Sequence, residues 1–192
     1  MKTVSVRNLG AQHTAVSYDG IVVSNTQAGQ IDIGRFSLDN VSMLSVAIGQ
    51  GSDMLQSARH YASAAVMGIT TEQPKLDADK ASLWRIGVSG GSWGQVNPKL
   101  RLWQRLSEST IMSINADYMR ADGNYPYTLV NGLESTRERR INSGISQWHV
   151  EGNVNTLFAD SSSLNVKGYY YRSSRGLPGS VILYNNESNE HL

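Results

Sequence analysis

Five segments in the second half of the chain alternate between apolar and polar residues. In Thr110–Arg120 the even-numbered residues Met112 to Tyr118 are apolar, whereas the odd-numbered residues Ser113 to Asp117 are polar. A period of two places each kind of residue on its own face of a β-strand. The same pattern recurs in Trp84–Ser89, Leu100–Leu106, Gln147–Phe158 and Ser163–Tyr171. We therefore predict five strands, each with one apolar and one polar face.

Connections between these segments alternate in length. Ser107–Ser109 and Asp160–Ser162 are tight turns and Gly94–Pro98 is short, whereas Ala121–Arg137 reads as a long polar loop. The predicted strands are about twice the usual length of 5–6 residues, and Trp and Tyr residues lie near their ends. Two interpretations fit. The strands form either a soluble antiparallel sheet with one wet face, or part of an outer-membrane barrel whose apolar face meets lipid.

The first half of the chain predicts shorter elements. Strands are expected at Thr3–Arg7, Thr14–Tyr18, Ile21–Val23 and Val41–Ile48, with a tight turn at Asp19-Gly20. Ile31–Phe36 fits a turn of helix, and Met54–Val66 fits a short helix or an irregular segment. Residues 72–81 are polar, contain Pro74 and read as a linker. The predicted organisation is an α+β unit over 1–71, a linker over 72–81, and strands over 82–192.

Composition excludes several classes of protein. The 192 residues include no cysteine, which excludes disulfide scaffolds and thiolate metal sites. Their formal net charge is +1, which argues against general nucleic-acid binding. There is no apolar run long enough for a transmembrane helix. The four histidines lack metal-ligand spacing, no Ser-His-Asp arrangement is recognisable, and Gly87–Gly94 lacks the context of a phosphate loop. We expect no metal, no cofactor and no enzymatic activity.

An ordered set of motifs resembles the plug domain of TonB-dependent outer-membrane receptors, followed by the first barrel strands. The motifs are Val4–Arg7, His13–Gly20, Ile31–Ile33, Met43–Gly49 and Gly68–Thr71. The sequence departs from the family where Asn8 follows Arg7, where Gly49-Gln-Gly51 replaces a Gly-Pro turn, and where Arg59–Tyr61 interrupts a run of small residues.

The resemblance implies a fold class that is mostly β, a plug remnant joined to antiparallel strands of a transmembrane barrel. Because such barrels have about 22 strands, the chain is expected to be a fragment. The implied function is import of a scarce nutrient, a cobalamin-like compound or a ferric siderophore, across the outer membrane of a Gram-negative bacterium. Implied partners are that nutrient or metal chelate, outer-membrane lipid, and a TonB-type energy transducer whose contact segment is absent. The alternative is a soluble or secreted all-β binding module, such as an adhesin or a carbohydrate-binding domain.

Two groups of site residues follow. The resemblance makes the loop after the Asp-Gly hairpin a plug apex that binds ligand, with uncharged amide and hydroxyl groups suited to a neutral polar ligand: Asn25, Thr26, Gln27 and Gln30. The polar face of the long strands would line the lumen and contact the plug through Arg85, Arg101, Arg105, Asn115, Asp117, Gln147 and Glu151.

Overall fold

The computed structural model describes residues 2–25, 29–49, 57–73, 76–77, 79–180 and 188–191. Within these residues the chain is mostly β, and its strand pairs are antiparallel except for one. The chain divides into two compact units, unit 1 (Met1–Gln73) and unit 2 (Pro74–Leu192). The division falls inside the polar segment 72–81.

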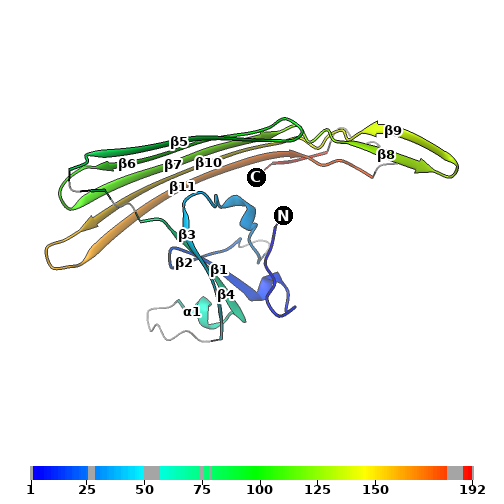
Figure 1. Cartoon of the computed structure of the whole chain (residues 1–192). Coiled ribbons are helices and arrows are strands. Elements are labelled where there is room, and N and C mark those ends of the chain that lie inside the picture. Colours follow the sequence, from blue (N-terminus) through cyan, green and yellow to red (C-terminus); the bar gives the residue numbers. More distant parts are fainter. Residues whose placement is uncertain are drawn as a thin grey trace. The chain divides into compact units, whose positions relative to one another are not determined.

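Unit 1 is built on a four-stranded mixed sheet in the order β2-β1-β4-β3 (Figure 1). Its strands are β1 (Thr14–Tyr18), β2 (Ile21–Val23), β3 (Val41–Ile48) and β4 (Ala65–Thr71). β1 pairs antiparallel with β2 and parallel with β4, and β3 pairs antiparallel with β4. The predicted bounds of β1, β2 and β3 are confirmed.

Asp19 does more in unit 1 than form the predicted turn. Asp19 and Gly20 both have positive φ, 48° and 85°, as a two-residue hairpin requires. The Asp19 carboxylate also accepts hydrogen bonds from the backbone N–H of Thr71 at 2.7 Å and from the Thr71 hydroxyl at 2.8 Å. These bonds tie the β1–β2 hairpin to the end of β4, more than 50 residues away in sequence.

Unit 1 contains a small apolar core. The cluster consists of Val16, Tyr18, Ile31, Phe36 and Ile69, and the rings of Tyr18 and Phe36 stack with their centroids 4.8 Å apart. The 3₁₀-helix η2 (Ile33–Arg35) lies between two of these residues and is capped by Asp32, whose carboxylate accepts from the Gly34 N–H at 2.9 Å. The predicted turn of helix at Ile31–Phe36 is therefore confirmed.

One prediction for unit 1 is wrong, and another, a short helix or irregular segment at Met54–Val66, is confirmed only in part. Thr3–Arg7 is not a strand, because the chain turns at Arg7 and Asn8, which have φ of 54° and 58°, before the 3₁₀-helix η1 (Ala11–His13). In the predicted helix Met54–Val66, residues 54–56 lie outside the described residues and helix α1 covers only Ala58–Tyr61. Ala65 and Val66 instead begin β4, because the β-branched run that follows them favours a strand between β1 and β3.

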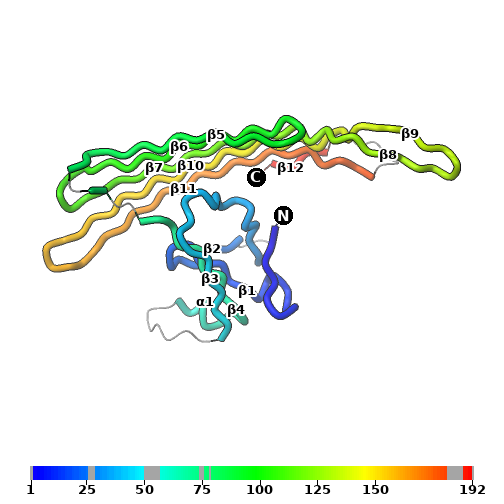
Figure 2. The backbone as a smooth tube through the Cα atoms, viewed as in Figure 1, coloured from blue at the N-terminus to red at the C-terminus, as the bar shows by residue number. Residues whose placement is uncertain are grey.

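Unit 2 contains a six-stranded antiparallel sheet in the order β12-β11-β10-β7-β6-β5. Its strands are β5 (Ser82–Gly91), β6 (Gln95–Arg105), β7 (Thr110–Ala121), β10 (Ile145–Leu157), β11 (Ser163–Gly176) and the short β12 (Asn189–His191). The five predicted long strands are confirmed. They pair in the order in which the chain visits them, as Figure 2 shows, so the sheet is a meander.

The predicted loop Ala121–Arg137 contains a hairpin that the sequence analysis missed. β8 (Pro126–Asn131) and β9 (Glu134–Arg139) pair across a turn at Gly132, which has a φ of 63°. The signal was present, since a β-forming run ends in Asn131-Gly132, a strong turn dipeptide. Figure 1 shows this hairpin continuing beyond the ends of β7 and β10.

The two ends of the six-stranded sheet differ. At one, the short-turn end, tight turns join β6 to β7 and β10 to β11. The other, the hairpin end, carries the β8–β9 hairpin and the β5–β6 turn, and its loops are tied together. The Trp93 carbonyl accepts from the Asp122 N–H at 2.9 Å, and the Asn142 side chain donates to the Ser188 carbonyl at 2.9 Å.

Candidate functional site

The six-stranded sheet has two chemically distinct faces, and strand register defines both. One row runs Ile86, Leu100, Ala116, Val150, Tyr170 across five strands. The adjacent row on the other face runs Arg85, Arg101, Asn115, Glu151, Tyr169. The apolar band comprises the apolar residues of the first face, which are Trp84, Ile86, Val88, Val96, Pro98, Leu100, Leu102, Met112, Ile114, Ala116, Tyr118, Trp148, Val150, Val154, Leu164, Val166 and Tyr170.

The burial of these faces is the reverse of that in a water-soluble sheet. On the apolar band Ile86 is 75% exposed, Val88 73% and Val166 56%. On the polar face Glu151 is 1% exposed and His149 3%. A soluble sheet ordinarily buries its apolar face and leaves its polar face in water. Some other medium or surface must therefore cover the apolar band.

Two polar side-chain contacts join neighbouring strands on the polar face. His149 Nδ1 lies 3.0 Å from an Asp117 carboxylate oxygen, and Lys167 Nζ lies 3.2 Å from Glu151 Oε1. The His149 ring also packs against Tyr169, with centroids 5.3 Å apart. Because Glu151 is almost fully buried, the Lys167 ammonium beside it offsets part of the cost of burying its charge.

Neutral hydrogen bonds extend this network toward the hairpin end. Gln147 Nε2 donates to the Tyr171 hydroxyl at 2.9 Å and to the Ser173 hydroxyl at 3.3 Å. Among the described residues, three buried polar atoms of this face have no hydrogen-bond partner: Asn115 Oδ1, His149 Nε2 and Asn153 Oδ1. Buried polar atoms of this kind are usually satisfied by water or a bound polar group, so the face suits a wet interior.

The arginines of this face have other contacts. The guanidinium carbons of Arg85 and Arg101 lie 5.3 and 5.2 Å from the centre of the Trp103 ring, within cation–π range. Arg105 donates to the backbone carbonyls of Leu76 and Asp77, at 3.2 and 3.0 Å. Arg105 thus holds the segment before β5 against the start of the sheet.

All seven residues predicted for the lumen share the polar face of this sheet, as the register requires: Arg85, Arg101, Arg105, Asn115, Asp117, Gln147 and Glu151. Their contact with a plug stays a prediction. Lys167, Tyr171 and Ser173 were not selected, although their odd numbers on β11 place them on the same face. Their importance follows from pairing with β10, which the sequence does not specify.

The predicted plug apex is placed only in part. Thr26 and Gln27 lie outside the described residues. Asn25 is exposed and its carbonyl accepts from the Gly29 N–H at 2.9 Å, and Gln30 is half-buried. The role of Asn25 and Gln30 in ligand binding stays a prediction.

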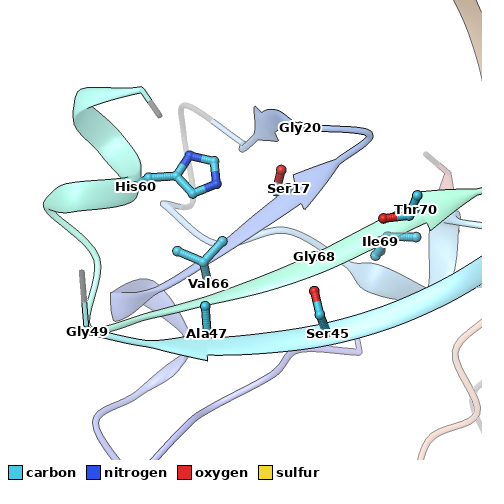
Figure 3. Close-up of a pocket in the computed structure, with 10 residues that line it drawn as sticks. All are labelled: Ser17, Gly20, Ser45, Ala47, Gly49, His60, Val66, Gly68, Ile69 and Thr70. Atoms are coloured by element: carbon cyan, nitrogen blue, oxygen red, sulfur yellow. The ribbon is translucent and has the colours of Figure 1, made fainter. Parts of the chain in front are cut away.

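An open depression of about 230 Å³ lies on the sheet of unit 1. Figure 3 shows His60 of α1 projecting toward Ser17 and Val66, with Ala47 and Ser45 along its floor. Gly68 keeps it open, because a Cβ there would lie 2.5 Å from the Ser45 hydroxyl. His60 Nδ1 is 3.1 Å from the Ser57 hydroxyl. Its lining mixes the polar side chains of Ser17, Ser45, His60 and Thr70 with apolar ones.

No protein-family model and no curated protein matches the chain. No helix among the described residues is long and apolar enough to cross a membrane. In the same residues, no group of three or more His, Cys, Asp or Glu side chains is placed to hold a metal ion.

Proposed function

We propose that the chain is part of an outer-membrane nutrient receptor of the TonB-dependent kind. In this proposal β5, β6, β7, β10 and β11 belong to a transmembrane wall, with the apolar band against lipid and the polar face toward an aqueous interior. Unit 1 is the corresponding part of the plug. The cargo is a cobalamin-like compound or a ferric siderophore, and a TonB-type transducer supplies the energy.

The observation that carries the proposal is the exposure of the apolar band. Nine of its large side chains are exposed: Trp84, Ile86, Val88, Val96, Trp148, Val150, Leu164, Val166 and Tyr170. Full burial of such a side chain contributes about 1.5–3 kcal/mol, so half-exposed side chains leave about 1 kcal/mol each unrealised. The sum is about 10 kcal/mol, comparable to the net stability of an ordinary domain. Hydrocarbon is a medium that covers this face without further protein.

Strand length and connections support the same proposal. The five long strands span 10–14 residues, and a tilted strand needs about 9–11 residues to cross a bilayer. Short turns at one end and a long hairpin at the other fit the periplasmic and extracellular sides of outer-membrane barrels. The hairpin end is therefore the outer end in this proposal.

Surface labelling of the intact gene product in its host cells tests this topology. The chain has no cysteine, so Leu133→Cys at the hairpin tip and Glu108→Cys in the β6–β7 turn add exposed sites to it, and any cysteine elsewhere in the gene product is replaced by serine first. A membrane-impermeant maleimide should label position 133 on intact cells, and position 108 only after the outer membrane is opened. Equal labelling of both positions, in a protein that fractionates with soluble proteins, would instead favour a secreted binding module.

Transport is tested separately. Deletion of the gene should abolish high-affinity uptake of either cobalamin or a ferric siderophore, and uptake should also stop when the energy transducer is deleted. Asn25→Ala combined with Gln30→Ala should weaken ligand binding without changing the amount of protein in the membrane. Unchanged uptake of both cargo classes in the deletion strain would contradict the import function and leave the membrane topology standing.

A further inference from the structure

We infer that the edge of the apolar band at the hairpin end is a binding site for the phosphate groups of anionic lipid headgroups, with Arg120 and Arg172 as its ligands. The inference rests on the proposed function, because it needs the band to lie in a bilayer. It adds a specific ligand class and a specific level in the membrane.

From β6 to β11 the apolar band runs obliquely across the strands, whereas on β5 its last apolar residue at the hairpin end is Val88, which pairs with Pro98 and does not continue the displacement. At the hairpin end its last apolar residue is Val96 on β6, Tyr118 on β7, Trp148 on β10 and Tyr170 on β11. Tyr118 and Trp148 pair with each other and define one row of the face. Val96 lies one row closer to the hairpin end than this pair, and Tyr170 lies one row farther from the hairpin end. The edge is thus displaced by four residues between β6 and β11.

The opposite edge is displaced in the same way. There the last apolar residues are Leu102 on β6, Met112 on β7, Val154 on β10 and Leu164 on β11. Met112 pairs with Val154, whereas Leu102 and Leu164 lie one row to either side of that pair. Both edges therefore shift by the same amount, and the band keeps its width.

This displacement gives the tilt of the strands in a flat bilayer. Four residues span about 13 Å along a strand, and three strand spacings span about 14 Å across the sheet. Both edges lie level only if the strands tilt by about 40° from the membrane normal. That angle falls within the range for transmembrane barrels, about 35–45°, although nothing in the register alone requires it.

The tilt brings three aromatic residues to one level and three polar residues just beyond them. On β7, β10 and β11 the band ends in Tyr118, Trp148 and Tyr170, and the next residue on the same face is Arg120, Ser146 and Arg172. The rings of Tyr118 and Trp148 pack 4.4 Å apart. Aromatic rings followed by arginines are what a hydrocarbon–headgroup boundary favours.

The arginines are placed to share a headgroup. From the register, two strand spacings and two residues separate Arg120 from Arg172, so their Cα atoms are about 12 Å apart with Ser146 between the two strands. Both arginines are exposed, and Arg120 has only an exposed ion pair with Asp122 at 3.4 Å, which contributes little. Guanidinium groups bind phosphate through paired N–H donors. The ligand is therefore a phosphate at the membrane surface.

Vesicle binding tests the site. The whole chain is mixed with vesicles of phosphatidylcholine alone, or of equal phosphatidylcholine and phosphatidylglycerol, and bound protein is measured by flotation. Arg120→Gln with Arg172→Gln should weaken binding to the anionic vesicles about 30-fold, from about fivefold per arginine, and leave binding to neutral vesicles unchanged. The matched control, Arg137→Gln with Arg139→Gln in the hairpin, removes the same charge and should weaken binding less than about threefold.

The outcomes separate the two proposals. Equal losses in the two double variants, or full competition by excess inorganic phosphate, would overturn the headgroup site and leave the transmembrane wall standing. Failure of the unmodified chain to bind either kind of vesicle would contradict the proposed contact between the apolar band and lipid. Spin-label depth adds an independent reading: a label at Tyr170→Cys should lie level with one at Val96→Cys, and a depth equal to that at Leu100→Cys would contradict the tilt.

Discussion

Units 1 and 2 bury opposite kinds of side chain. Among the described residues, eight of the nine buried apolar residues belong to unit 1, and only Trp103 belongs to unit 2. Six of the nine buried polar or charged residues belong to unit 2. Both units are β-sheets, so secondary structure alone does not explain the difference. Unit 1 is organised around an apolar core in the way of a water-soluble domain, whereas unit 2 is organised around a polar face.

The largest loss of stability is expected from a substitution in the apolar core of unit 1, which tests whether the two units are stabilised independently. Phe36→Ala removes the ring that stacks on Tyr18 and should lower the free energy of unfolding of unit 1 by about 3–5 kcal/mol. Amide hydrogen exchange resolves the two units residue by residue. Protection should fall in β1 and β4 and stay unchanged in β7 and β10. A matching loss of protection in β10 would show that the units do not fold independently.

A charge on the apolar band should be the next most damaging change. Val166→Arg should destabilise the folded state in lipid by about 2–4 kcal/mol, because it places a guanidinium in hydrocarbon. The control, Asn165→Arg, occupies the neighbouring position of β11 on the polar face and should change stability by less than about 0.5 kcal/mol. Urea titration in lipid vesicles measures both. Equal costs at the two positions would break the contrast between the faces.

Breaking the buried Lys167–Glu151 ion pair of the polar face should lower the free energy of unfolding by less than the upper values expected for Phe36→Ala and Val166→Arg. Lys167→Met removes the ammonium 3.2 Å from the buried Glu151 carboxylate and should cost about 2–3 kcal/mol, discounted because Lys167 is partly exposed. Adding Glu151→Gln should restore most of that loss, since no buried charge remains. A double variant as unstable as the single one would mean that packing around Lys167, rather than its charge, stabilises this face.

The smallest expected change in stability concerns the Asp160 carboxylate at the short-turn end of the sheet. The Asp160 carboxylate accepts hydrogen bonds from the Ser162 hydroxyl at 2.6 Å and the Ser162 N–H at 3.0 Å, and these bonds lower the pKa of Asp160 below its ordinary value of 3.8. The stabilisation is therefore present above that ordinary value and is lost as the pH falls through the lowered pKa. Ser162→Ala should raise the pKa toward 3.8 in an NMR titration, and an unchanged pKa would contradict the assigned cause.

Sequence patterns predict unit 2 better than unit 1 for a physical reason. A sustained period of two indicates a β-strand and not a helix, so the five long strands and the membership of their faces were predictable from residues such as Met112 to Tyr118. Thr3–Arg7 alternates over only five residues, and the turn at Arg7-Asn8 overrides it. The start of β4 was assigned to the helix because Ala and Met around it favour a helix, whereas the β-branched residues that follow and pairing with both β1 and β3 make it a strand.

The candidate site was predictable as a face and not as a set of contacts. Alternation assigns Asp117, His149 and Glu151 to one side of the sheet. The partners of these residues depend on register, and only pairing of β10 with β11 brings Lys167 to Glu151. The oblique course of the apolar band is likewise invisible along any one strand and emerges when neighbouring strands are aligned.

Nitroxide accessibility along β10 tests the central claim most directly. Single cysteines from Gln147 to Val154 in the chain folded in lipid vesicles would be labelled and compared for collision with oxygen and with a water-soluble nickel chelate. We predict that oxygen accessibility peaks at the even-numbered positions, including Trp148 and Val150, and chelate accessibility at the odd-numbered ones. The opposite phase, or no alternation, would contradict a sheet whose apolar band faces hydrocarbon.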